Sequence, residues 1–203
     1  SGKFDVSGKG EGKIANSGNS FSVNNQLDID HMFNVTDENV LYLSNFETSL
    51  NFIRDNTTRD FDNLFGSVSL TGTRAFSNVV LNDLNADLIF NQSKLFFNIS
   101  GIVDTALNAE TEGILEMTKG KQLIKFSGLS LDFKGINWTS RDTIEAAFTP
   151  QDFTITNFNL HHELSQLYAA GYLDSLGNQN FVLKANGLEG KTINRYIPGF
   201  EYS

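Results

Sequence analysis

Apolar and polar residues alternate along most of this chain. Apolar side chains recur at every second position in Leu27–Val35, Leu95–Ile99 and Leu129–Phe133, with mainly polar residues between them. Successive side chains of a β-strand point to opposite faces, so this period of two predicts strands with one apolar and one polar face. Similar segments return at spacings of roughly 8–12 residues, which is typical of all-β folds. We therefore predict an all-β protein of roughly a dozen to sixteen strands.

Polar clusters and breaks in the alternation predict where the strands end or bend. Turns are expected at Asn24–Asn25, Asn91–Gln92, Lys119–Lys121 and Ser175–Asn178. The alternation slips by one residue at Gly135 and again at Asn157. One-residue slips of this kind predict β-bulges, which bend a strand and re-aim its side chains.

The chain is predicted to form a single domain over residues 1–203, because no Pro-rich or Gly/Ser-rich linker divides it. Residues 1–18 are rich in glycine and are expected to be irregular. The polar stretch Asp55–Asp62 is expected to be a long loop. Thr192–Tyr196, which precedes Pro198 and Gly199, predicts one short C-terminal helix.

Composition excludes several classes of partner and chemistry. The net charge of −9 repels phosphate backbones, so no nucleic-acid partner is expected. The absence of cysteine removes disulfides, zinc–thiolate sites and thiol nucleophiles. The 18 phenylalanines favour strands and bring large apolar surfaces.

The sequence contains few patterns that are typical of metal-binding or catalytic sites. His31 stands in the apolar phase of its strand, and the adjacent His161 and His162 would point to opposite faces, so no set of converging zinc ligands is expected. Asp55, Asp60 and Asp62 lack the spacing of an EF-hand loop. No nucleophile elbow, P-loop or dinucleotide fingerprint occurs. The sequence therefore predicts a protein that is not an enzyme and uses neither cofactor nor metal.

The C-terminal part of the chain resembles a known repeat. In its predicted strands apolar and polar residues alternate, one strand contains a glycine, and a Pro-Gly pair closes the repeat. These features lie in Phe153–Leu160, Ala170–Leu173, Phe181–Ala185 and Ile197–Gly199. This meander is similar to the repeat of AsmA-like proteins and of the translocation-and-assembly module (TamB) group among them. The resemblance is strongest over residues 129–199 and is looser over 20–115, where Gly66–Gly72 matches the same rhythm.

The resemblance implies a fold, a place and a role. Members of this family form a curved, elongated antiparallel sheet, an open U-shaped groove (β-taco) with an apolar interior. The implied setting is the cell envelope of Gram-negative bacteria, in the periplasm, with a tether to the inner membrane contributed by a segment outside residues 1–203. The implied role is non-enzymatic: lipid transport between the membranes or outer-membrane biogenesis. The implied partners are phospholipid acyl chains, outer-membrane β-barrel proteins and flanking repeats of the same chain.

On this interpretation, apolar side chains of one strand face line a lipid groove. The candidate lining residues are Leu95, Phe97, Ile99, Leu129, Leu131, Phe133, Phe153, Ile155, Phe181 and Leu183. Periodicity alone does not separate such a lining from an ordinary core. The alternative is a carbohydrate-binding or adhesin-type β-sandwich of a secreted or surface protein, with its apolar faces closed between two sheets. An enzyme that uses a pair of carboxylates is a third reading.

Overall fold

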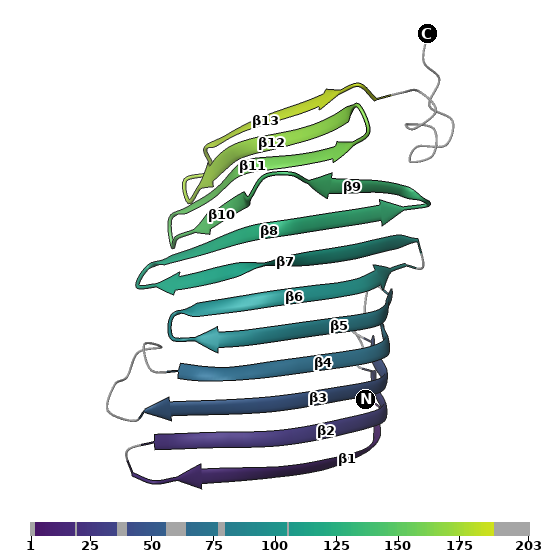
Figure 1. Cartoon of the computed structure of the whole chain (residues 1–203), viewed down its shortest axis with the longest axis vertical. Helices are drawn as coiled ribbons and strands as arrows, with labels where there is room; N and C mark the ends of the chain where they lie inside the picture. Colours follow the sequence, from purple (N-terminus) through teal and green to yellow (C-terminus); the bar gives the residue numbers. More distant parts are fainter. Residues whose placement is uncertain are drawn as a thin grey trace.

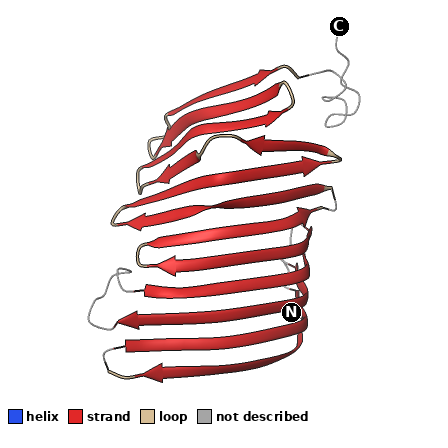
Figure 2. Ribbon diagram, in the orientation of Figure 1, coloured by secondary structure: helices blue, strands red, loops and turns tan. Residues whose placement is uncertain are grey.

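The structure is a computed structural model, and it describes residues 3–18, 20–35, 40–55, 64–76, 80–104 and 106–188. Within these residues every regular element is a β-strand, and all strands belong to one antiparallel sheet (Figures 1 and 2). The predicted all-β class is thereby confirmed. The predicted helix at 192–196 and residues 56–62 of the predicted loop lie outside the described residues.

The strands follow one another as a meander. Their bounds are β1 Lys3–Asn16, β2 Ser20–Val35, β3 Val40–Asp55, β4 Leu64–Phe76, β5 Val80–Asn91, β6 Lys94–Val103, β7 Leu107–Thr118, β8 Lys121–Phe133, β9 Ile136–Ser140, β10 Ile144–Phe148, β11 Asp152–His162, β12 Ser165–Asp174 and β13 Gln179–Asn186. Each strand pairs with its neighbours in sequence, except that β9 and β10 share one level between β8 and β11. The sheet stays open, with β1 at one edge and β13 at the other (Figure 1).

Several local predictions can be compared directly with these bounds. The turns at Asn91–Gln92, Lys119–Lys121 and Ser175–Asn178 are confirmed in position. The expected turn at Asn24–Asn25 is wrong, because β2 runs through it and pairs on both sides. The irregular N-terminal segment is also wrong, because residues 3–16 form an edge strand. Backbone pairing with β2 orders this strand despite its glycines.

The two predicted bulges have different outcomes. Asn157 has a φ of 55°, and the β11–β12 register shifts between Ile155 and Phe158, so this bulge is confirmed. The slip at Gly135 is not a bulge. Lys134 and Gly135, with φ of 54° and 79°, form the turn between β8 and β9. A tight hairpin turn reverses the chain and produces the same change of phase as a bulge.

Residues that pair directly across strands share a face of the sheet, so the pairing can be followed as rows of side chains. One row is unbroken from β1 to β13 and is called here the Ile14–Phe181 row. It comprises Ile14, Val23, Phe52, Gly66, Phe90, Leu95, Leu115, Ile124, Ala146, Ile155, Gly171 and Phe181. All of its members are apolar or glycine, which identifies this face as the apolar face.

A second row on the same face marks a bend in the sheet. It comprises Val6, Met32, Leu43, Ala75, Leu81, Val103, Leu107, Phe133 and Ile136. Between the two rows, β2, β3, β4 and β5 each contain one residue more than β1 and β6, and the register shifts at the β1–β2 and β5–β6 boundaries. Four strands therefore carry an extra residue at the same level.

The aligned extra residues curve this part of the sheet. Asn45 and Asp83 adopt positive φ there, and Asn45 Nδ2 donates to Thr73 Oγ1 at 3.4 Å. Bulges bend strands, and beyond this level the ends of β1–β4 turn sharply out of the plane of the view (Figure 1). Phe46, beside the bend on the apolar face, is buried, whereas Asn45 and Asp83 are exposed. The apolar face therefore lies on the inside of the bend.

A second region of curvature contains the best-packed part of the molecule. Residues 141–143 interrupt the strand structure between β9 and β10, so that these two short strands together occupy one position in the sheet, between β8 and β11. Ile136, Trp138, Ile144 and Leu160 form a buried cluster, with Ile144 only 1% exposed. Leu188, which follows β13, packs against this cluster. This buried cluster thus lies on the apolar face, toward the β13 end of the sheet.

Phenylalanine rings on the apolar face lie over glycines of the neighbouring strand. At Gly72 an added Cβ would come within 2.5–2.7 Å of ring atoms of Phe46, and at Gly113 it would meet Phe97 at 2.6 Å. Phe181 stands in the same way over Gly171. A ring that covers a cross-strand glycine shields the bare backbone and compensates for the missing side chain.

We expect Gly72→Ala to lower the free energy of unfolding by about 1–3 kcal/mol, because the new methyl group collides with the buried Phe46 ring. Urea unfolding followed by circular dichroism measures the change. The control is Gly101→Ala on β6, where the nearest atoms to an added Cβ are 3.5 Å away. That control should be neutral or slightly stabilising. Equal losses in both variants would contradict the ring-over-glycine packing.

The turn between β12 and β13 depends on a carboxylate. Asp174 accepts hydrogen bonds from Asn178 Nδ2 at 2.8 Å, from Asn178 N at 2.8 Å and from Leu176 N at 3.0 Å. The hydrogen bond from the Asn178 side chain is the largest cause that lowers the pKa of Asp174 below its ordinary value. A lowered folded-state pKa means that this contribution to stability is complete at neutral pH and is lost as the pH falls below about 4.

We therefore expect amide protection in β13 to decrease in acid more than protection in β7 and β8, as measured by hydrogen exchange with NMR detection. In Asp174→Ala, β13 should exchange faster than in the wild type at neutral pH, and the acid-dependent difference should be reduced. Unchanged protection of β13 in that variant would show that the carboxylate does not order the turn.

Candidate functional site

The apolar face forms a continuous surface between the bend and the core. The middle of this face is built from β3–β8 and carries no charged residue. Its side chains there include Leu50, Phe52, Val68, Leu70, Ala86, Leu88, Phe90, Leu95, Phe97, Ile99, Leu115, Ile124, Phe126 and Leu129. One cross-strand row on this face runs from Leu27 in β2 to Leu129 in β8. Its polar members are Thr48 and Thr111.

No described strand covers this face. All described strands lie in the one sheet, and the substantial contacts between strands are all between neighbours in that sheet. The large side chains in the middle of the face are half-buried. Phe97 and Phe126 illustrate this packing, with ring centroids 5.7 Å apart in an edge-to-face arrangement across two strands. Among the described residues, the face is therefore an apolar surface that no second layer of strands covers.

The structure brings the predicted lining residues to this one face. Leu95, Phe97 and Ile99 of β6 alternate with the polar face, as expected from their spacing. The others on the same face are Leu129, Leu131, Phe133, Phe153, Ile155, Phe181 and Leu183. Leu129 and Leu131 pack against the buried cluster, so they are closer to core residues than to an open lining. Leu183, on the edge strand, is 77% exposed.

Sequence reasoning missed the contribution of β3–β5 to this face. Leu50, Phe52, Val68, Leu70 and Leu88 pair in the same rows as the predicted residues. Their alternation was visible in the sequence. What it did not reveal was that β3–β5 lie beside β6 in register, because pairing partners come from topology and not from the period of a single strand.

The histidines do not form a site together. His31 was expected on the apolar face, but the extra residue in β2 places it on the face opposite Met32, with Nε2 3.4 Å from Asp5 Oδ2. His162 Nδ1 donates to the carbonyl oxygen of Asn137 at 2.8 Å, and its ring centroid lies 5.6 Å from that of Trp138, with the two rings tilted by 46°. Neighbouring His161 points to the other face of β11. Across the described ranges, no group of three or more His, Asp or Glu side chains is arranged to hold a metal ion.

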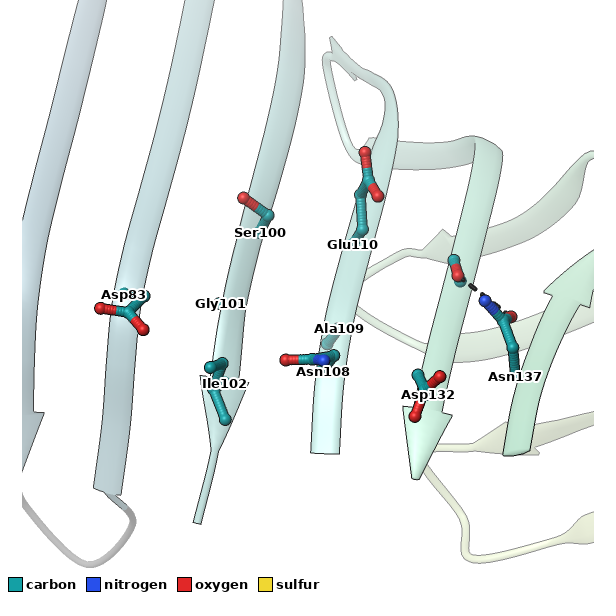
Figure 3. Close-up of a pocket in the computed structure, with 10 residues that line it drawn as sticks. Asp83, Ser100, Gly101, Ile102, Asn108, Ala109, Glu110, Asp132 and Asn137 are labelled. Atoms are coloured by element: carbon teal, nitrogen blue, oxygen red, sulfur yellow. Dashed lines mark hydrogen bonds between the residues drawn. The ribbon is translucent and has the colours of Figure 1, made fainter. Parts of the chain in front are cut away.

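The polar face is acidic and shallowly indented. One hollow of about 410 Å³ is lined by Asp83, Glu110 and Asp132, with amides and hydroxyls between them (Figure 3). Ser130 Oγ donates to Asn137 Oδ1 at 3.2 Å at one side of it. The carboxylates come from three different strands, and the lining contains no aromatic side chain. The lining of this hollow therefore resembles the rest of the polar face, and it offers no aromatic surface on which a ring could stack.

The polar face also carries an apolar patch on β5–β7. Ile89, Phe96 and Ile114 pair across β5, β6 and β7, and Ile89 is 54% exposed. The signal in the sequence is the pairs of adjacent apolar residues Ile89-Phe90, Phe96-Phe97 and Ile114-Leu115, which break the alternation. Each pair places one residue on each face.

Comparisons with known proteins give no relative from which a role can be inferred. The sequence matches no protein-family model, and it finds no match among curated proteins or solved structures. Within the residues that the structure describes, no helix has the length and hydropathy required to cross a lipid bilayer. Arguments about function therefore depend on the geometry of the sheet.

Proposed function

We propose that this chain is a non-enzymatic β-groove protein of the bacterial cell envelope whose apolar face shields phospholipid acyl chains. The observation that supports the proposal is the middle of the apolar face on β3–β8, which carries no charged residue and which no described strand covers. The AsmA- and TamB-like rhythm of residues 129–199 supports the same class of function and a periplasmic location. The second occupant considered for this surface is a nascent strand of an outer-membrane protein.

The chemistry of the face suits an acyl chain better than a polar ligand. Apolar patches of more than a few hundred Å² on a soluble protein usually mark a binding surface. Each methylene group that leaves water contributes roughly 0.8 kcal/mol, so an acyl chain needs no specific polar contact to bind. The bend at β2–β5 and the curvature at β9–β11 both place the apolar face on the inside. Such a shape surrounds an extended chain on more than one side.

The alternative function predicted a β-sandwich, in which two sheets enclose the apolar residues. The described strands form one sheet, so the two-sheet architecture on which that alternative depended is not present among them. The hollow on the polar face carries no aromatic platform for a sugar ring. No observation favours carbohydrate binding over acyl-chain binding.

Phe96 and Phe97 provide a matched test, because they are adjacent on β6 and lie on opposite faces. We expect Phe97→Asp to weaken binding of a phosphatidylethanolamine with a fluorescent acyl chain at least tenfold, equivalent to about 1.4 kcal/mol. A carboxylate at this position is unfavourable beside an acyl chain. Phe96→Asp, on the polar face, should bind as the wild type does. Fluorescence titration and native mass spectrometry of the bound lipid provide the two measurements.

Circular dichroism and thermal unfolding establish that both variants remain folded. If Phe97→Asp is unfolded, Ile99→Asn, on the same face, takes its place. A wild-type protein that never retains lipid, or equal binding by the Phe96 and Phe97 variants, would remove the support for acyl-chain binding.

A further inference from the structure

The two edges of the sheet are complementary to each other. Among the described residues β1 pairs only with β2, and β13 pairs only with β12. Edge strands leave a row of unpaired backbone N–H and C=O groups, and proteins commonly block them with proline, with bulges, with charged side chains such as lysine or with charges on the inward face. Neither edge strand contains proline, and the apolar-face positions of both carry no charge: Gly8, Gly10, Gly12 and Ile14 in β1, and Phe181, Leu183 and Ala185 in β13.

The number of strand levels lets the sheet continue from one copy to the next. Thirteen strands, less β9, which shares a level with β10, leave twelve levels. Because neighbours are antiparallel and twelve is even, β1 and β13 run in opposite directions, as Figure 1 shows. A second copy stacked along the sheet axis therefore presents its β1 antiparallel to β13, with its apolar face on the same side.

The side chains select one register for this contact. If the Ile14–Phe181 row continues into the second copy, Phe181 stands opposite Ile14. The same register places Leu183 opposite Gly12 and Lys184 opposite Glu11, so that opposite charges meet on the polar face. Ile14 and Leu183 are 71% and 77% exposed in the single copy and would be covered by the pairing. A shift of two residues that places Lys184 opposite Lys9 brings like charges together.

We propose that β13 of one copy pairs with β1 of a second copy in this register, so that the apolar face continues from copy to copy. The contact is heterologous, which means that it joins two different surfaces and leaves a free edge at each end of the assembly. Long apolar faces would then be built from several copies. The contact involves main-chain pairing of both edges and does not depend on a bound lipid.

Cysteine cross-linking tests the register directly, because the chain has no cysteine of its own. Residues that face each other across an antiparallel pair have Cα atoms about 4.5–5.5 Å apart, which a disulfide spans. We expect Glu11→Cys and Lys184→Cys, purified separately, mixed without lipid and oxidised, to form a disulfide-linked dimer that contains one of each. Both positions are exposed, so the substitutions leave the fold intact.

Two controls make the test decisive. Lys119→Cys, in the β7–β8 turn away from both edges, should give little dimer with Lys184→Cys. Glu11→Cys alone should also give little disulfide-linked dimer, because β1 of one copy does not pair with β1 of another in this assembly. The proposal is overturned if the Glu11 and Lys184 pair gives no more dimer than the Lys119 pair, or if Glu11→Cys alone cross-links equally well.

Charge reversal provides an independent measurement in solution. Sedimentation velocity of the unmodified protein should show association that increases with concentration. Glu11→Lys or Lys184→Glu should each weaken it, and the double variant should restore it. A protein that stays monomeric throughout, or association that neither reversal changes, would also reject the proposal. These results are separate from lipid binding by the single copy, which the Phe97 and Phe96 variants measure.

Discussion

The structure depends on one constraint: a single β-sheet must stabilise its own apolar face, because the described residues form no second layer that packs against it. Substantial contacts run only between neighbouring strands, so the order of the molecule is nearly one-dimensional, as in repeat proteins. Each strand is held by backbone pairing and by the side chains beside it in a row. Large aromatic and aliphatic residues extend over their neighbours, and phenylalanine rings cover cross-strand glycines. This packing half-buries the large side chains of the face.

Curvature is the second means by which the sheet covers its apolar side. The extra residues shared by β2–β5 bend the strand ends toward the apolar face and enclose Phe46. The break between β9 and β10 does the same at the other end and encloses Trp138 and Ile144. Both devices work by local backbone geometry, and each buries apolar residues only where the sheet turns. The part of β3–β8 that lies between the bend and the buried cluster is the part that the proposed function uses.

The sequence predicted the class of fold and the identity of the apolar face well, because both follow from the period of two. Leu95, Phe97 and Ile99 lie where the alternation places them. It predicted the continuity of strands poorly. Asn24 and Asn25 favour a turn locally, yet both pair on each side within β2, since neighbouring strands determine where a strand ends. Glycine-rich β1 is ordered for the same reason.

The errors at His31 and Gly135 have a common physical origin. A change of phase in the sequence has at least two structural causes, an extra residue within a strand and a turn between strands. His31 was assigned to the apolar face because the alternation in Leu27–Val35 continues through it. The bend instead inserts one unpaired residue into β2 before His31, which turns His31 to the polar face. The bend itself requires four strands to carry their extra residues at one level. That alignment is a property of register, which a single sequence does not display, and it is register again that decides whether the two open edges of this sheet fit each other.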